Sequence, residues 1–195
     1  AAMIARQIAP GLRRTFSFEE WNWIDNRLIQ EVRTEASKKI NRDLVLDIMG
    51  TDIDARMVEI AKENAQKAGV ASDITFKQMR VQDLRSDKIN GVIISNPPYG
   101  ERLSDDAGVT KLYAEMGEVF EPLKTWSKFI LTSDENFEKK FGRQADKKRK
   151  LYNGTLKLDL YQFFGVRVRR QATCEIGKIW QKQINRIWVT RQSKF

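Results

Sequence analysis

Short apolar runs alternate with helical patterns along most of this chain, and this alternation restricts its fold more than any other feature. The runs that read as strands cover residues 44–50, 74–78, 91–95 and 128–132. Helical patterns begin at Asp54 and at Lys111, and two further strand-like runs are joined by Asn153-Gly154, a strong hairpin signal. We therefore expect an α/β fold with an open, mostly parallel sheet and a C-terminal antiparallel hairpin.

Residues 1–40 come before the first strand-like run and predict two helices separated by Pro10-Gly11. The second helix is expected from Ser17 to Ile40 and contains Trp21 and Trp23. The rings of these tryptophans could stack on nucleic-acid bases. Tryptophans at this spacing are more typical of a core, however, so we expect both to be buried.

The sequence contains no histidine and a single cysteine, Cys174. The missing histidine excludes Ser-His-Asp and Cys-His nucleophile systems and every histidine-ligated metal site. One cysteine can form neither an intramolecular disulfide nor a multi-thiolate zinc site, so we expect no metal and a reducing, cytoplasmic location. No apolar run approaches the roughly 18 residues of a membrane span and no signal-peptide pattern opens the chain, so we expect no membrane partner.

The net charge of +9 is concentrated near the C-terminus. Residues 166–195 hold eight basic residues against one acid, Glu175, so this segment accounts for +7 of the total. We therefore divide the chain into a domain over residues 1–165 and a basic tail over residues 166–195. Such a tail favours a polyanionic partner, nucleic acid in the first place, although a solvated tail without a partner would carry the same charge.

Polar residues follow two of the strand-like runs, where ligands bind in open α/β sheets. Gly50-Thr51-Asp52-Ile53-Asp54 ends the first run, and Gln82-Asp83 follows the second. A carboxylate at a strand end can accept hydrogen bonds from both hydroxyls of a ribose, which makes Asp52 a candidate ribose ligand. Asp54 is better explained as the N-cap of the next helix, and Asp83 could accept from an adenine amino group.

The run Ser95-Asn96-Pro97-Pro98-Tyr99 is the most specific motif in the chain. Two consecutive prolines after a buried strand fix the backbone and remove two amide donors. Asn96 can present its side-chain oxygen, together with the Pro97 carbonyl, to an exocyclic NH2 group, and Tyr99 offers a ring on which a base can stack. Such acceptors align an amine for methylation and stabilise the positive charge that develops on its nitrogen.

At these residues the chain resembles the class I, S-adenosylmethionine-dependent amino-methyltransferases that act on nucleic acids, whose hallmark is the tetrapeptide Asn96 to Tyr99. Over residues 1–165 it is similar to bacterial ribosomal-RNA guanine-N2 methyltransferases that carry an N-terminal THUMP domain. The longer match includes Ala2 to Gly11, Phe16 to Trp23, Gly50 to Asp54, Asn96 to Arg102 and Leu151 to Gly154.

The resemblance implies a Rossmann-like class I methyltransferase sheet, with S-adenosylmethionine as cofactor and RNA as partner. It implies that Asp52 holds the cofactor ribose and Asp83 the adenine. The cofactor-binding residues expected are Asp52, Ile53, Gln82, Asp83 and Asn96. The residues expected around the target base, as catalytic residues, are Asn96, Pro97, Pro98 and Tyr99.

The family's first strand and glycine-rich cofactor loop would come just before Ala1 and are not in this sequence. That strand lies centrally, between the strand ending at Asp52 and the strand ending at Asn96. We therefore expect the sheet to lack its central strand, unless its neighbours close on each other or a second copy fills the slot. We also expect the 195-residue chain alone to bind S-adenosylmethionine very weakly.

The function expected from these features is methyl transfer from S-adenosylmethionine to an exocyclic amino group, with guanine N2 of 23S ribosomal RNA as the target. A DNA adenine-N6 methylase shares the same tetrapeptide and is the first alternative. A truncated, non-catalytic fragment that binds RNA through its basic tail is the second.

Overall fold

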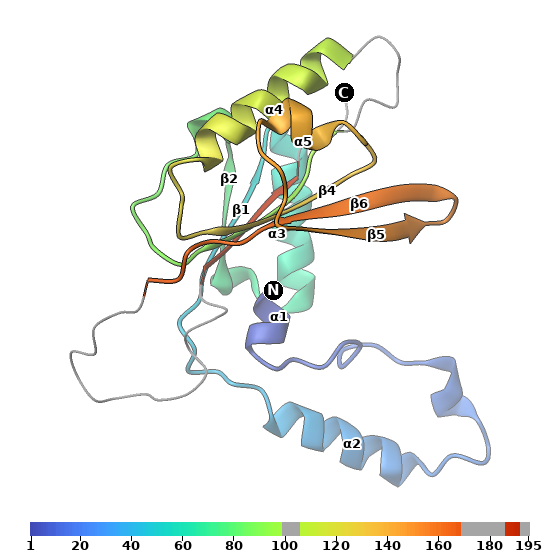
Figure 1. Cartoon of the computed structure of the whole chain (residues 1–195). Coiled ribbons are helices and arrows are strands. Elements are labelled where there is room, and N and C mark those ends of the chain that lie inside the picture. The colour runs from blue at the N-terminus through green and yellow to red at the C-terminus, as the bar shows by residue number, and fades with distance from the viewer. Residues whose placement is uncertain (99–105, 169–185, 192–195) are drawn as a thin grey trace.

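The computed structural model describes residues 1–98, 106–168 and 186–191, and its strands form one seven-stranded sheet (Figure 1). The order across the sheet is β2-β1-β7-β3-β4-β6-β5, and every pairing is parallel except those that β6 makes with β4 and β5. The expected α/β sheet with an antiparallel hairpin is confirmed. The strands are β1 (Asp47–Asp52), β2 (Ile74–Gln78), β3 (Val92–Asn96), β4 (Ser127–Thr132), β5 (Lys147–Asn153), β6 (Leu156–Phe163) and β7 (Arg186–Arg191).

Helices cover both faces of the sheet, with α4 and α5 on one face and α1 and α3 on the other (Figure 1). Each face has its own apolar cluster, because successive residues of a buried strand point to opposite sides. In β1, Ile48 packs with α1 and α3, whereas Met49 packs against the cluster beneath α4. The helices are α1 (Ala2–Ala5), α2 (Asn26–Lys38), α3 (Ala55–Ala68), α4 (Asp106–Phe120) and α5 (Phe137–Phe141), with short 3-10 turns η1 (Ser17–Glu20), η2 (Ala71–Asp73) and η3 (Val81–Asp83).

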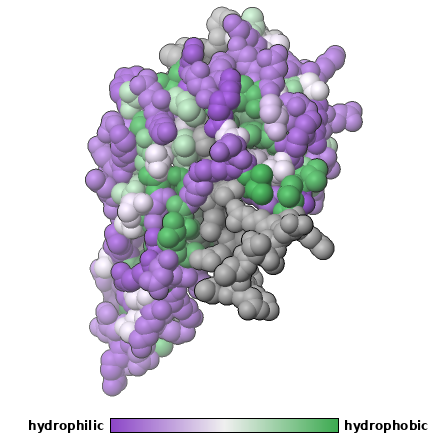
Figure 2. Space-filling view, turned by 90° about the vertical axis from the view of Figure 1, so that its left-hand side faces the viewer, coloured by the Kyte–Doolittle hydropathy of each residue, from purple (hydrophilic) through white to green (hydrophobic). Residues whose placement is uncertain are grey.

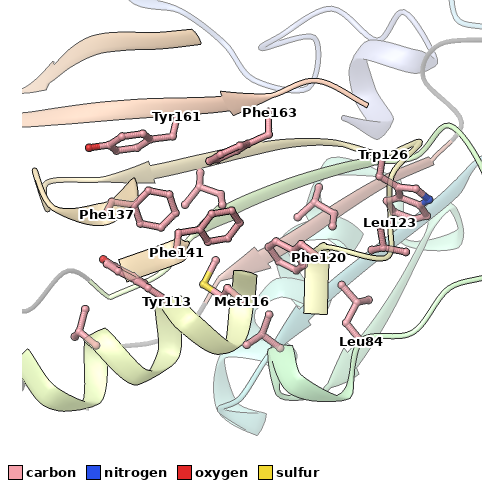
Figure 3. Close-up of a cluster of buried hydrophobic side chains, with 14 residues drawn as sticks. Leu84, Tyr113, Met116, Phe120, Leu123, Trp126, Phe137, Phe141, Tyr161 and Phe163 are labelled. Carbon is pink, nitrogen blue, oxygen red and sulfur yellow. The ribbon is translucent and has the colours of Figure 1, made fainter. Parts of the chain in front are cut away.

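The larger cluster is rich in aromatic rings from α4, α5 and β6 (Figure 3). Phe137 contacts Tyr161 with ring centroids 4.7 Å apart, and Phe141 contacts Phe163 at 4.9 Å. Tyr113 of α4 meets Phe137 edge to face at 4.9 Å. These contacts fix α4 and α5 against the β4–β6 side of the sheet, so this part of the molecule is a rigid support for the loop that follows β3.

The central position of the sheet is occupied by β7, which pairs in parallel with β1 on one side and β3 on the other. Our expectation that this slot lacks a strand was therefore wrong. The sequence of β7 is Arg-Ile-Trp-Val-Thr-Arg, and its apolar middle has the β-branched and aromatic residues typical of a buried parallel strand. We had included these residues in a basic tail. The division at residue 165 stays a prediction, but residues 186–191 belong to the sheet.

Residues 7–41 leave the sheet and return to it as an arm that carries η1 and α2. Figure 1 shows α2 well away from the sheet, and Figure 2 shows the arm as a narrow, mostly hydrophilic projection below the rest of the molecule. No residue of α2 is buried. The expected single helix over residues 17–40 was wrong, since Asp25 caps a separate α2 by accepting from the Arg27 amide at 2.8 Å.

The tryptophans of the arm are exposed, Trp21 at 50% and Trp23 at 76%, so the expectation that they are buried was also wrong. They pack on their own neighbours instead of the sheet. Ring centroids are 5.2 Å apart between Trp21 and Trp23, 6.5 Å between Trp21 and Phe18, and 5.6 Å between Phe18 and Phe16. Contacts between neighbouring rings, stacked in the Phe16–Phe18 pair and tilted or edge to face in the other two, thus replace core burial in this segment.

Arg6 fastens the base of the arm to the sheet. Its guanidinium donates to both carboxylate oxygens of Asp73, at 2.6 and 2.5 Å, and Asp73 is buried. The same guanidinium donates to the carbonyls of Asn41 and Arg42, where the chain returns from the arm. The Arg6 side chain therefore contacts the chain at both ends of the arm. The bidentate pair with Asp73 fixes the orientation of its guanidinium.

Candidate functional site

The carboxyl ends of β1, β7 and β3 lie side by side at one edge of the sheet. Thr51 of β1 and Ser95 of β3 both pair with Thr190 of β7. Asp52 and Asn96, each the next residue, therefore stand at the same height on the edge with one strand between them. Two strand spacings separate them by roughly 10 Å. The sheet thus brings together the predicted ribose ligand and the predicted base-binding asparagine.

Asp52 is buried at the end of β1, with 5% of its surface exposed. Its Oδ1 accepts a hydrogen bond from the Asp54 amide at 2.9 Å, and its carbonyl accepts from the Met79 amide at 2.9 Å. The neighbouring Thr51 hydroxyl is also buried and makes no hydrogen bond within the described residues. These contacts hold the Asp52 carboxylate at the carboxyl end of β1.

Asp54 has the structural role that the sequence predicted. It caps α3, accepting from the Arg56 amide at 2.8 Å, and pairs with the Arg56 guanidinium at 3.2 Å. The hydrogen bond from Arg56 lowers the pKa of Asp54. The position of Asp54 is therefore explained by its role as the N-cap of α3.

Gln82 and Asp83 lie in η3, next to the end of β2. Asp83 is exposed and pairs with Arg80, with Nε and Oδ2 3.1 Å apart, and the hydrogen bond from Arg80 lowers its pKa. Gln82 donates from Nε2 to Glu115 of α4. An exposed ion pair contributes little free energy, so Asp83 could exchange Arg80 for another donor at small cost. The Ile53 carbonyl accepts from the Gln78 side chain at 3.0 Å.

The motif after β3 begins with an exposed Asn96 and a fully buried Pro97. The Asn96 side chain makes no hydrogen bond to any described residue, so its amide oxygen is available as an acceptor. The Pro98 carbonyl accepts from the Tyr113 hydroxyl at 2.9 Å. Tyr99, the expected stacking ring, lies outside the described residues.

Tyr113 of α4 fixes the position of Pro98 through this hydrogen bond, a role that the sequence analysis missed. Its hydroxyl is also 2.9 Å from the Thr132 hydroxyl at the end of β4, and burial raises the pKa of Tyr113 to about 12. The phenol therefore keeps its proton and remains a donor to the Pro98 carbonyl. No local signal could have shown this contact, because Tyr113 follows Pro98 by 15 residues and precedes Thr132 by 19.

The site combines an available amide acceptor with a buried carboxylate on a rigid edge. Among the described residues there is no cluster of three side chains able to hold a metal ion. None of the helices that the structure describes is long and apolar enough to cross a membrane. The arrangement suits a reaction that depends on aligning two bound molecules, because positioning alone can supply much of a rate enhancement.

Comparison with known proteins gives a consistent result. The model of the RMKL-like methyltransferase domain matches residues 1–162. The chain is 52% identical over 174 residues to "Putative RNA methyltransferase YpsC" of Bacillus subtilis, covering 89% of this chain and 45% of that protein. It is 38% identical to the ribosomal RNA large subunit methyltransferase K/L of Shewanella amazonensis in an alignment of 198 positions that covers 96% of this chain and 28% of the relative. The chain thus spans less than half the length of these two relatives.

Solved structures with the same fold include SMU.472 complexed with SAH, at 62% identity and a TM-score of 0.83 over 86% of this chain and 45% of that chain. A second is a "predicted N6-adenine-specific DNA methylase" from Listeria monocytogenes, at 47% identity and a TM-score of 0.79 over 85% of this chain and 42% of that chain.

Proposed function

Because the chain belongs to the family of RMKL-like methyltransferase domains, we propose that it takes part in methyl transfer from S-adenosylmethionine to an exocyclic amino group of an RNA base. Guanine N2 of 23S ribosomal RNA is the target that we propose within this class. One observation carries the proposal: an exposed Asn96 with an available amide stands one strand away from a buried Asp52 carboxylate.

The residues at the edge fit the nucleoside part of the cofactor. Asp52 would accept from the ribose hydroxyls, with Ile53 beside it, and Gln82 and Asp83 would contact the adenine. Asp52 suits this role because its carboxylate is buried, and hydrogen bonds to a charged acceptor in such a place are about twice as strong as neutral ones. The bound cofactor supplies a methyl group on a sulfonium, which needs no protein nucleophile.

The chain's own contribution is to align the amine. Asn96 would accept from the exocyclic NH2 group and stabilise the charge that develops on its nitrogen as the new bond forms. Pro97 is buried and the Pro98 carbonyl is held by Tyr113, so the backbone that presents Asn96 has little freedom to move. Tyr99 would stack on the target base.

Two other functions fit parts of the same site. Adenine N6 of DNA is also an exocyclic amine, and the Listeria structure named above is 47% identical to this chain. RNA is the preferred substrate because two relatives, YpsC and the K/L enzyme, are named as RNA methyltransferases. The third function is RNA binding without catalysis.

The test is transfer of a labelled methyl group to 23S ribosomal RNA and to duplex DNA, with the methylated base identified by mass spectrometry. It is carried out with the 195-residue chain and with a fusion in which Ala1 is preceded by the part of YpsC that comes before the matched region. The proposal expects N2-methylguanine in RNA. N6-methyladenine in DNA would support the alternative, and RNA binding without transfer by either protein would support a non-catalytic role.

Asn96→Ala should lower the single-turnover rate about a hundredfold, since loss of an aligning acceptor costs on the order of 3 kcal/mol. Cofactor affinity should change less than twofold, because in this proposal Asn96 would contact the target amine. Asn64→Ala, an exposed asparagine of α3, is the matched control. A rate for Asn96→Ala within threefold of the wild type would contradict the assignment.

A further inference from the structure

The hairpin formed by β5 and β6 stands at the edge of the sheet and extends beyond the other strands (Figure 1). The strands are joined through Gly154, whose φ of +61° is the left-handed conformation that glycine adopts readily. β5 opens with four consecutive basic residues, Lys147 to Lys150, and all four are exposed. Tyr152, near the tip, is 70% exposed.

The tip of this hairpin lies next to the candidate site. Thr132, the last residue of β4, pairs with Asp159 of β6, whereas β6 begins three residues earlier at Leu156. The tip therefore projects roughly 10 Å past the carboxyl end of β4. β4 in turn pairs with β3, whose last residue is Asn96. The hairpin thus flanks the site on the side of Asn96, away from Asp52.

Three of the basic residues on β5 form no close ion pair within the described residues: Lys147, Arg149 and Lys150. Lys148 differs, because its ammonium pairs with Glu138 at 3.2 Å and lies 4.6 Å from the centre of the Tyr161 ring. Side chains alternate along a strand, so Lys147 and Arg149 project from one face of β5, and Lys150 projects from the other face together with Tyr152. Positive charges on an outermost strand attract a phosphodiester backbone, because each neutralised phosphate releases condensed counterions.

Lysines on an outermost strand also prevent the sheets of two molecules from pairing edge to edge. This role would explain the positive charges without any ligand. It does not explain an exposed tyrosine at the end of the same strand. Cations that bind phosphates beside an aromatic ring that stacks on a base are the combination by which proteins bind single-stranded nucleic acid. We propose that the β5–β6 hairpin binds the RNA strand next to the target base, through Lys147, Arg149, Lys150 and Tyr152.

This inference rests on the proposed function, since it takes RNA as the substrate. The probe is fluorescence anisotropy of a 12-nucleotide oligo(U) RNA at several salt concentrations. The triple variant Lys147→Ala/Arg149→Ala/Lys150→Ala should weaken binding at least tenfold near 100 mM salt. It should also reduce the slope of log K against log salt by about 2, because each phosphate contact on a single strand contributes about 0.7.

The matched control removes the same charge from exposed lysines that have acidic partners, in Lys39→Ala/Lys62→Ala/Lys67→Ala. An equal loss of affinity in both triple variants would overturn the proposal, because net charge would then explain the effect. Aggregation of the β5 variant with unchanged affinity of its monomer would overturn it too, in favour of edge protection. If the β5 triple variant weakened the binding of oligo(dT) and left the binding of oligo(U) unchanged, the choice of RNA as the partner would be overturned.

Tyr152→Ala provides an independent measurement that changes no charge. It should weaken oligo(U) binding at least fivefold with the salt slope unchanged, and Tyr152→Phe should restore the affinity, because stacking needs the ring alone. Affinity lost equally in both Tyr152 variants would contradict the stacking role. These readouts measure binding and not transfer, so absence of methyltransferase activity would count against the proposed function without affecting them.

Discussion

Replacing Asp52 with alanine should weaken the binding of S-adenosylmethionine and leave the rest of the site in place. The carboxylate is buried, and its Oδ1 accepts a hydrogen bond from the Asp54 amide at 2.9 Å. Two hydrogen bonds from ribose hydroxyls to a carboxylate contribute roughly 1.5–3 kcal/mol each. Losing both costs about 3–6 kcal/mol, so the dissociation constant for S-adenosylmethionine should rise at least a hundredfold.

The assay is calorimetric titration of the wild type and the variant, each as the 195-residue chain and in the YpsC fusion described above, with urea unfolding as a check on folding. Asp54→Ala is the control, because it removes the cap of α3 and leaves the proposed ligand in place. It should lower stability while the dissociation constant stays within twofold. An unchanged dissociation constant in Asp52→Ala would refute the assignment, and a large rise in Asp54→Ala would move the ribose contact to that residue.

Further predictions concern the framework of the site. Deleting residues 186–195 removes about ten ladder hydrogen bonds of β7, which contribute roughly 10 kcal/mol in all. Cooperative urea unfolding should therefore disappear. Deleting only residues 192–195 should leave it intact. Arg6→Met leaves the buried Asp73 carboxylate without its cation and should lower the free energy of unfolding by about 3 kcal/mol, unless Asp73→Asn accompanies it. Burial lowers the pKa of Lys128 from 10.5 to about 8. Between pH 8 and 10.5 the unfolded chain therefore keeps a proton that the folded chain has lost, so the free energy of unfolding should rise by about 2 kcal/mol over this range. The rise should be absent in Lys128→Met.

The parts of the fold that the sequence predicted depend on local signals. Alternating apolar runs, the Asp54 cap and the Asn153-Gly154 turn each specify their own segment, and the structure confirms them. The ends of parallel strands meet at one edge in any such sheet, so the placing of Asp52 beside Asn96 follows from topology. Their roles as ligands of the cofactor and the base stay predictions.

The parts that it did not predict depend on contacts distant in sequence. The six residues of β7 have the composition of a buried strand, but only pairing with β1 and β3 distinguishes such a run from part of a basic tail. Trp21 and Trp23 fit a core by composition, but they lie on an arm that carries them away from the sheet. Whether an apolar residue is buried is decided by where its segment goes.

The position of β7 has a consequence for how the protein is made. The ribosome synthesises β7 after every other described strand, yet β7 lies between β1 and β3, more than 90 residues earlier in the chain. Until it emerges, β2 and β1 can form only one small sheet, and β3, β4, β6 and β5 another, each with an unpaired edge. Parallel pairing over such separations is slow, and open edges recruit other chains. Among the described strands, the facing sides of β1 and β3 therefore gain their common partner last.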